Sequence, residues 1–411
     1  MLGKTKSTRD LPFYLRLHSA PIPGNPSSSP PTSRKEKPPV RGMTPHHAGY
    51  ITVDETYNSN TWFWYFPVEG FEESETPLVL WLQGGPGASS LFGLFEELGP
   101  FSVDPEGEHL IENPNSWHKK YNLLFIDNPV GTGFSFTDPE GYATNQTQIG
   151  MQLYSFMTQF LTLFPELQQV PFFISGESYA GKHIPSLAYQ IHKNNPSAPL
   201  KINLQGLAIG NGFIDPASMM DYSSFVYQAG LVDNKVAARM KVFEVHCDAA
   251  LAANDWELAA ESISVYNYVY EESGSSLYGP FTKFIQRPEV KKALHVGSNK
   301  FGSLSTVYTK LIGDFMTSAK PWLEELLEHY RIMSYRYVKK AGNLQEVMVR
   351  NAGHMVPTDQ PVLQYLGCSP LTKNIPFPFS IIHLPLSLLL PSLKEFIPFS
   401  FKPTENRIYY L

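Results

Sequence analysis

One segment of the 411-residue chain has the residue types of a serine nucleophile held in a sharp turn. The segment is GESYAG (176–181), which follows the apolar run PFFIS and precedes a helix-like stretch. A turn from strand to helix pushes the hydroxyl of Ser178 above the sheet, and it requires small residues two positions before and after the serine. Gly176 and Ala180 meet this requirement. The N-terminal N–H groups of the following helix would face negative charge that develops during acyl transfer.

A glycine-rich segment could supply hydrogen-bond donors for that charge. It is QGGPGASS (83–90), and it follows the apolar run PLVLWL. Its glycines allow backbone N–H groups to approach a ligand closely, so we expect the N–H groups of Gly85 and Tyr179 to form an oxyanion hole. A glycine-rich turn without a catalytic function is the alternative.

A histidine near the C-terminal end of the chain could act as the base. His354 lies in NAGHM (351–355), directly after the strand-like run QEVMV. A histidine can accept the proton of a serine hydroxyl and return it to the leaving group. His354 also comes after Ser178 in chain order, as the Ser, Asp, His order of this kind of site requires.

The apolar runs before these segments predict a parallel sheet. Four runs continue without alternation and end in Gly or Asn clusters, as strands buried on both faces do. They lie at 77–85, 122–131, 170–181 and 204–212. Helix-like stretches at 151–167 and 182–195 separate some of them, which indicates βαβ units. An aromatic and β-branched stretch at 49–71 predicts antiparallel edge strands, and a helix at 321–330 and a strand-like run at 345–354 are expected to return to the sheet.

Three other segments are expected to lie outside this sheet. Residues 1–48 form a basic, Pro/Ser-rich leader that we expect to be disordered, and they lack the apolar run of a signal peptide. The domain is expected at 49–366, with a mostly helical insertion at about 215–300. The tail at 367–411 is apolar but is interrupted by prolines, whereas a membrane span needs about 20 uninterrupted apolar residues. No membrane span is therefore expected.

Composition limits the partners and cofactors. The net charge of −6 and the 17% of charged residues suit a globular protein and do not suggest nucleic acid as a partner. The two cysteines, Cys247 and Cys368, support neither a disulfide framework nor a CxxC metal site, so no metal or cofactor is expected. Asn145 begins the single glycosylation sequon, NQT, which would be used if the protein is secreted.

Several long segments resemble the serine carboxypeptidases, most closely the vitellogenic-like branch. They are WLQGGPGASSLFGLFEELGPF, NLLFIDNPVGTGFSF, FFISGESYAGKHIPSLA, GLAIGNGFIDP and NAGHMVPTDQP. The resemblance extends from about Gly49 to Gln364. It implies an α/β-hydrolase fold, with a mostly parallel central sheet and a helical cap insertion. It also implies a protease that releases the C-terminal amino acid of peptides and proteins, at acid pH, in the lysosome or after secretion; it implies no oligomeric state.

The resemblance also assigns roles to individual residues. The nucleophile and base would be Ser178 and His354, and the oxyanion donors Gly85 and Tyr179. The residues expected to bind the terminal carboxylate of the substrate are Gln83, Gly84, Glu97 and Glu177. Family members often carry Asn where this chain has Gln83, and Gln still offers an amide donor. Ala88 stands where many members carry a disulfide cysteine.

The two glutamates of this group predict a pH dependence. Glu97 and Glu177 cannot both stay ionised beside a substrate carboxylate, because like charges raise the pKa values of one another. Protonated, they would donate hydrogen bonds to the terminal carboxylate; ionised, they would repel it. Peptide binding should therefore weaken as the pH rises. Two unrelated surface glutamates are the alternative.

The chain departs from the family at the third member of the triad. Relatives carry an aspartate just after a strand of the type IYNGQLD, but here EELLEHYRIM passes directly into SYRYVKKAGNLQEV, and no Asp lies between Asp314 and His354. Asp359 is not the counterpart of the triad acid, and Glu346 lies in the strand leading to His354. We expect a deletion near 333–334, from a splice event or a flawed gene model. Loss of the aspartate costs on the order of 10⁴ in kcat.

The motifs therefore allow three functions. The first is a serine carboxypeptidase. The second is a catalytically impaired homologue that binds peptide C-termini through Gln83, Glu97 and Glu177, which the missing aspartate favours. The third is an acyltransferase, in which an alcohol replaces water on the same scaffold.

Overall fold

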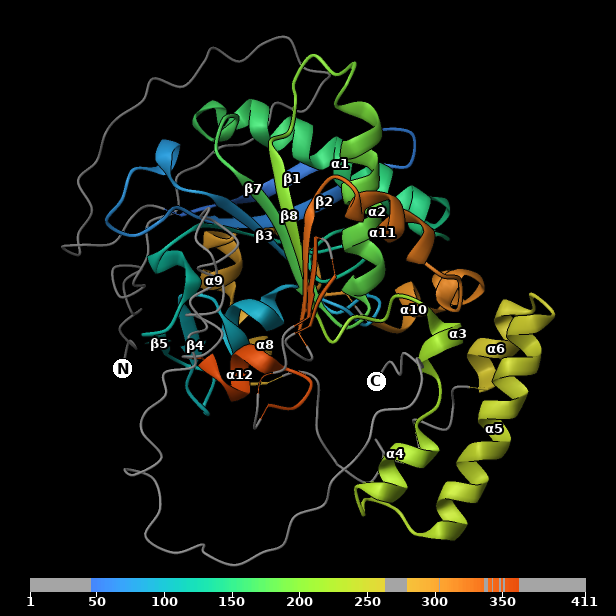
Figure 1. Ribbon diagram of the computed structural model, residues 1–411. Coiled ribbons are helices and arrows are strands. Elements are labelled where there is room, and N and C mark those ends of the chain that lie inside the picture. Colours follow the sequence, from blue (N-terminus) through green and yellow to red (C-terminus); the bar gives the residue numbers. More distant parts are fainter. Residues whose placement is uncertain are drawn as a thin grey trace, which may run out of the picture.

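The computed structural model describes residues 46–262, 279–302, 304–335, 339–341, 343–346, 349 and 352–361 (Figure 1). The tail expected at 367–411, and all but the last three residues of the leader, lie outside the described residues. So does Cys368.

A central sheet organises the described part of the chain. Its strand order is β1-β2-β6-β3-β7-β8-β9-β11-β10. The strands are β1 (His47–Asp54), β2 (Ser59–Phe66), β3 (Leu78–Leu82), β6 (Asn122–Ile126), β7 (Phe172–Glu177), β8 (Leu204–Gly210), β9 (Arg331–Tyr335), β10 (Lys339–Ala341) and β11 (Leu344–Glu346). Every pairing from β6 to β11 is parallel, whereas β1 and β2 pair antiparallel at one edge and β10 pairs antiparallel at the other. The predicted α/β fold with a mostly parallel sheet is confirmed, as are the antiparallel strands in the stretch 49–71. A separate hairpin consists of β4 (Phe101–Val103) and β5 (Leu110–Glu112).

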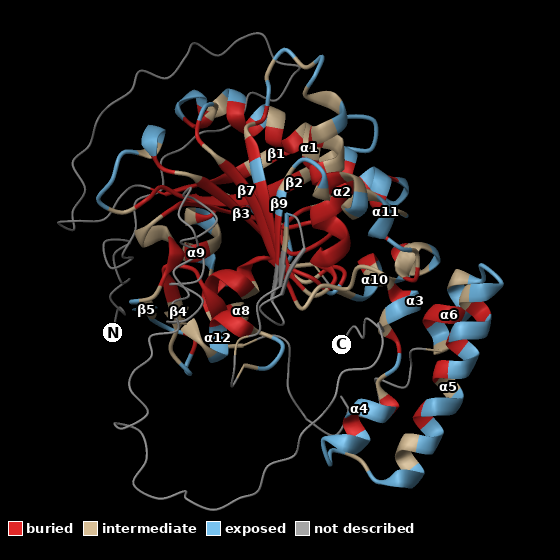
Figure 2. Ribbon diagram, viewed as in Figure 1, coloured by how far each residue is buried: buried red, intermediate tan, exposed pale blue. Residues whose placement is uncertain are grey.

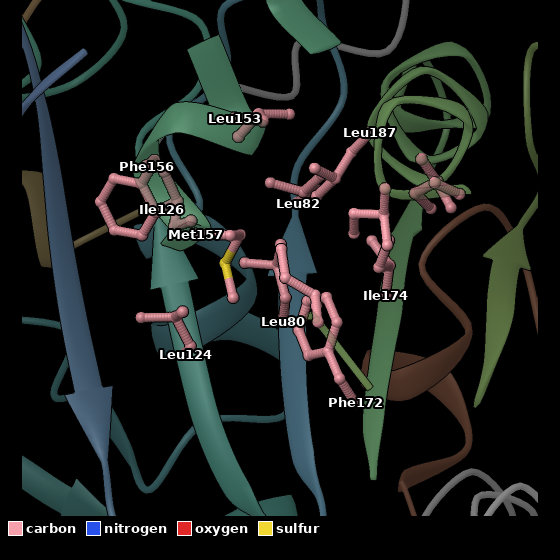
Figure 3. Packing of buried hydrophobic residues seen from close by; sticks show 14 of the residues in the cluster. Leu80, Leu82, Leu124, Ile126, Leu153, Phe156, Met157, Phe172, Ile174 and Leu187 are labelled. Carbon is pink, nitrogen blue, oxygen red and sulfur yellow. The ribbon is translucent and has the colours of Figure 1, made fainter. Parts of the chain in front are cut away.

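Both faces of the central strands are buried, which explains their continuous apolar sequences. In β3, Leu78, Leu80 and Leu82 belong to the core on one face, and Val79 and Trp81 belong to the core on the other. Figure 2 shows buried residues throughout the central strands. Figure 3 shows the first core, in which leucines of β3 lie among side chains of the neighbouring strands and helices. Burying each Leu or Phe contributes roughly 1.5–3 kcal/mol.

Helices cover the two faces. The first face is covered by α1 (Gln146–Leu163), α2 (Ala180–Asn194) and α11 (Lys320–Leu327), which overlap the helical stretches predicted from the sequence. The second face is covered by α8 (Phe281–Ile285), α9 (Pro288–Ala293) and the π-helical turn η3 (Gly93–Glu97). α1 begins at Asn145, whose Oδ1 accepts a hydrogen bond from the N–H of Gln148 at 3.0 Å.

The described part of the predicted insertion is largely helical. It includes α3 (Pro216–Met219), α4 (Ser223–Gln228), α5 (Asn234–Ala252), α6 (Trp256–Ser262), α8 and α9. α4, α5 and α6 project from the body of the domain (Figure 1). α5 and α6 share a small core around Cys247 and Ala259, which Met316 joins just after α10 (Leu304–Phe315). A final short helix, α12 (Val356–Asp359), follows His354.

The sheet is continuous at 333–334, where a deletion is expected from the sequence. β9 contains both Met333 and Ser334, and it pairs parallel with β8 on one side and β11 on the other. The expected deletion therefore falls within one paired strand.

No helix among the described residues is both long enough and apolar enough to cross a membrane. The proline-interrupted run in the tail lies outside those residues.

Candidate active site

The turn between β7 and α2 holds Ser178 in a strained backbone conformation. Its φ is +59°, a region that non-glycine residues seldom adopt. The Ser178 N–H donates to the carbonyl of Gly210 at 2.9 Å, and the Ser178 carbonyl accepts from the N–H groups of Gly181 and Phe213. Gly176 faces the carbonyl of Leu82 so closely that a Cβ would collide with it. The strand, turn and helix expected around Ser178 are therefore present. Backbone hydrogen bonds to neighbouring residues hold Ser178 in its strained conformation.

The glycine-rich segment after β3 lies directly against this turn. A Cβ added to Gly84 would lie 2.7 Å from both the Ser178 Cβ and the Tyr179 backbone nitrogen. No side chain could occupy that space without moving the turn. The next residue, Gly85, has a φ of +110°, which favours glycine. The structure thus brings Gly84 against Ser178 and Tyr179, with Gly85 next in the chain. The oxyanion hole expected from the N–H groups of Gly85 and Tyr179 stays a prediction.

A buried aspartate braces the glycine-rich segment. Asp127 accepts hydrogen bonds from the Ser89 Oγ at 2.5 Å and the Phe134 N–H at 2.8 Å. Burial raises the pKa of the Asp127 carboxyl to about 7. Asp127 is not among the residues predicted from the sequence, although it stands at the end of an apolar run, where side chains of parallel strands reach the edge of the sheet.

Packing below Tyr179 fixes the first turn of α2. The Tyr179 ring stacks on Phe315 at 5.1 Å between centroids, and the Lys182 ammonium lies 5.4 Å from the Tyr179 centroid. Lys182 is fully buried. Its ammonium donates to the Asp314 carbonyl at 2.5 Å, the Thr317 hydroxyl at 3.0 Å and the Phe315 carbonyl at 3.2 Å. Burial lowers the Lys182 pKa to about 8, although the Asp314 carboxylate opposes this shift. Lys182 thereby joins α2 to the end of α10.

Replacing Lys182 with methionine is expected to lower the free energy of unfolding by about 3 kcal/mol, because it leaves buried acceptors and the Asp314 carboxylate without their donor. Denaturant unfolding would measure this loss. Lys193→Met is the matched control: it removes an exposed lysine of the same helix, paired with Glu325, and exposed pairs contribute about 0–1 kcal/mol. Equal losses in the two variants would contradict the bracing role of Lys182.

A buried amide and carboxyl pair lies beside the turn. The Gln83 Nε2 donates to the Glu177 Oε1 at 2.8 Å, and the Trp81 Nε1 donates to the Gln83 Oε1 at 2.8 Å. The indole therefore fixes which end of the amide faces Glu177. Glu97, from η3, is also buried, and neither of its carboxyl oxygens has a hydrogen-bond partner of good geometry within the described residues. A pocket borders the pair, and Glu177 and Trp117 are among its lining residues.

Both carboxyls favour the protonated form. Burial raises the pKa of Glu177 to about 8, although hydrogen bonds from its neighbours oppose the shift. The pKa of Glu97 is raised well above its ordinary value, first by burial and next by the charge of Glu177. The alternative of two unrelated surface glutamates does not fit, because both side chains are buried and each influences the other.

The loop that carries His354 is tied to the same edge of the sheet. The Asn211 Nδ2 donates to the His354 carbonyl at 2.8 Å, and Asn211 directly follows Gly210, whose carbonyl binds the Ser178 N–H. The Asp359 Oδ2 accepts from the Gly353 N–H at 2.6 Å. Asn211 is not among the residues predicted from the sequence. Its position directly after a strand could have indicated a place at this edge of the sheet.

The His354 ring, in contrast, makes no hydrogen bond to Ser178 or to any carboxylate among the described residues. The side chain is exposed, and partial desolvation lowers the pKa of its imidazole. Hydrogen bonds between catalytic groups commonly shorten only when the substrate binds. The structure therefore brings the His354 loop to the turn but does not form the pair of side chains.

Within the described residues, no group of three or more His, Cys, Asp or Glu side chains could hold a metal ion.

Comparison with known proteins adds the decisive observation. A family profile described as serine carboxypeptidase matches residues 37–336. The chain belongs to the serine carboxypeptidase family.

Individual relatives agree with this assignment. The vitellogenic carboxypeptidase of Aedes aegypti is 38% identical and covers 79% of this chain and 82% of its own length. The venom serine carboxypeptidase of Apis mellifera is 37% identical, with coverages of 77% and 81%. Among solved structures, a prohormone-processing carboxypeptidase of Saccharomyces cerevisiae, KEX1(DELTA)P, matches with a TM-score of 0.68 and 25% identity over 78% of this chain and 89% of that one. The resemblance to the vitellogenic-like branch is thus confirmed.

Proposed function

We propose that this carboxypeptidase-family chain hydrolyses the last peptide bond of peptides and proteins. The observation that carries the proposal is the buried Gln83 and Glu177 pair, which lies one residue from the strained Ser178. A group that binds a terminal carboxylate so close to a nucleophile would select the bond next to the free C-terminus.

The proposed steps are those of a serine hydrolase. The Ser178 Oγ attacks the carbonyl carbon while His354 accepts its proton, and the N–H groups of Gly85 and Tyr179 stabilise the oxyanion. His354 then protonates the leaving amine, which departs as the free C-terminal amino acid. Water, deprotonated by His354, then attacks the acyl carbon; the bond to the Ser178 Oγ breaks, His354 returns the proton to that oxygen, and the shortened peptide leaves with a new C-terminal carboxyl group. Gln83, Gly84, Glu97 and Glu177 hold the terminal carboxylate.

Work at acid pH is part of the proposal. With a pKa raised to about 8, the Glu177 carboxyl is protonated in acid and can donate to a carboxylate. The raised pKa of Glu177 also makes the fold more stable in acid than in base: this contribution is complete below the ordinary value of 4.5 and is lost as the pH rises from there through about 8.

Binding of a peptide with a free C-terminus should therefore weaken with rising pH. If one group with the pKa of Glu177 controls binding, Kd should rise about tenfold between pH 5 and pH 9. The measurement uses the Ser178→Ala variant, so that binding is observed without cleavage. Adding Glu177→Gln should reduce the change to less than about threefold, whereas Glu140→Gln, at an exposed glutamate outside the site, should leave it as in the parent. A Kd that does not depend on pH would contradict the proposed role of Glu177.

The second candidate is an impaired homologue that binds peptide C-termini without cleaving them. It is favoured because the His354 ring has no hydrogen bond to a carboxylate among the described residues. We infer that a segment with the triad aspartate is missing near 333–334. Two features of the comparisons support this. The family match ends at residue 336. The alignment with the Aedes aegypti relative spans 394 positions, but it covers only 79% of this chain, which is fewer residues, so the alignment contains gaps on the side of this chain. An acyltransferase would use the same groups with an alcohol as acceptor, and product analysis with added alcohol tests it.

Location and processing are proposed on the same basis. We propose a lysosomal or secreted protein, in line with the vitellogenic and venom relatives, with a glycan at Asn145. We also propose that the carboxypeptidase domain extends from residue 49 to residue 366 and carries an insertion at about 215–300.

A further inference from the structure

Helix α5 exposes a continuous apolar face. Along this face the exposed residues follow one another at spacings of four, three, four and three. They are Ala238, Val242, Val245, Ala249 and Ala252, here called the outer face of α5. The two valine side chains are each 54% exposed, and Leu231, three residues before the helix, is 66% exposed. Alternate spacings of three and four are those of a helix that packs against another helix.

The opposite face of α5 is already buried. Met240, Cys247 and Ala250 pack in the core of the insertion, and the Glu244 carboxylate accepts hydrogen bonds from the start of α4. A helix at the surface ordinarily has one apolar face and one polar face. Because α5 is apolar on two sides, we expect a second contact to cover its outer face. Figure 1 shows α5 at the margin of the insertion, away from the central sheet.

The charges beside the outer face indicate what covers it. Lys241 and Asp248 lie seven residues apart on one edge of the face, in equivalent heptad positions. If two copies of α5 pack antiparallel, equivalent edges meet, so Lys241 of each copy lies opposite Asp248 of the other. In a parallel pair Lys241 would face His246 and gain no attraction. The other edge carries Arg239 and His246 and adds no attraction in either arrangement.

Both charged groups can take part. Asp248 makes no ion pair among the described residues of its own chain. Lys241 lies 3.1 Å from Glu244 and 3.2 Å from Asp221, which hold its ammonium at this edge of the helix. In a two-fold arrangement the contact between Lys241 and Asp248 occurs twice, once from each copy to the other, as in an isologous interface.

We propose that the outer face of α5 binds the same face of a second copy of this chain, with the two helices antiparallel. The outer face runs from Ala238 to Ala252, so the contact is about 21 Å long, and the small side chains allow the helices to approach closely. One helix from each copy makes a small interface, in the class of weak contacts below about 1,200 Å², so we expect a dissociation constant of about 10 μM. This dimer does not depend on the catalytic proposal.

Sedimentation velocity of the full chain over a range of concentrations tests the proposal. The parent should change from monomer to dimer, and Val242→Asp should raise the dissociation constant at least tenfold by placing a charge in the contact. Met151→Asp is the matched control, because Met151 is a 57% exposed apolar residue on α1, and this variant should dimerise as the parent does. A parent that stays monomeric up to about 100 μM, or a dimer that Val242→Asp leaves intact, would overturn the proposal.

Zero-length carbodiimide crosslinking tests the orientation. When ¹⁴N-labelled and ¹⁵N-labelled chains are mixed, an amide between Lys241 of one isotope and Asp248 of the other is expected. Within one chain these residues are two helical turns apart, about 10.5 Å along the axis, and the mixed isotope labels distinguish a crosslink between two copies from one within a chain. A dimer without a mixed-isotope Lys241–Asp248 crosslink would contradict the antiparallel arrangement.

Discussion

Replacing Ser178 with alanine should lower peptide cleavage to the background rate, by about 10⁵–10⁶-fold if the triad aspartate is present and by about 10²-fold if it is absent, because Ser178 is the group that forms the acyl-enzyme. Covalent labelling by a fluorophosphonate probe should disappear as well, since only an activated serine reacts quickly. The change removes one oxygen atom and leaves the hydrogen bonds of the Ser178 backbone to Gly210, Gly181 and Phe213 in place. The folded state should therefore persist.

Ser197→Ala is the control for this variant. Ser197 is an exposed serine just after α2, so its removal should change neither labelling nor cleavage. If Ser178→Ala retains the activity and labelling of the parent, the nucleophile is another residue. If the parent itself is not labelled, the impaired homologue is the better account.

Replacing Gly84 with alanine should lower kcat by about 10²–10³-fold, which is the usual cost of losing one oxyanion donor. The added methyl group would lie 2.7 Å from the Ser178 Cβ and the Tyr179 nitrogen, so the turn and the glycine-rich segment must separate. Steady-state kinetics with a short peptide would measure the loss of kcat, and KM should rise as well, because Gly84 is also one of the residues proposed to hold the terminal carboxylate.

Gly313→Ala is the matched control. Gly313 lies in α10, and an added Cβ would meet only the Glu257 carboxyl at 3.8 Å, an ordinary contact. Alanine also favours the helix more than glycine does. A Gly84→Ala variant as active as Gly313→Ala would show that the close approach of the two segments has no catalytic role.

The sequence predicted the elements that position the site because their signals are local. The runs that became β3, β6, β7 and β8 are apolar without alternation, since both faces of each strand are covered. The turn at Ser178 was also predictable, because small residues must flank a serine in that backbone conformation. Glycine at 84 and 85 likewise indicated a close approach of backbone to a ligand.

Contacts between distant segments could not be predicted in this way. Lys182 reads as an ordinary lysine on a helix, and only the fold shows that it binds the end of α10. Asn211 reaches the His354 loop across more than 140 positions of sequence. The outer face of α5 was hidden for a related reason: its valines and alanines suit a buried helix equally well, and only the packing of the opposite face shows that they are exposed.

The central claim is that Ser178 and the buried glutamates together make an exopeptidase. The most direct test is to incubate the purified chain at about pH 5 with a peptide that has a free C-terminal carboxylate and with the same peptide as a C-terminal amide, and to follow both by mass spectrometry. The account predicts that the free peptide loses single residues from its C-terminus, slowly if the triad aspartate is absent, and that the amide is cleaved much more slowly. Cleavage of both peptides at the same rate, or cleavage at internal bonds, would contradict it.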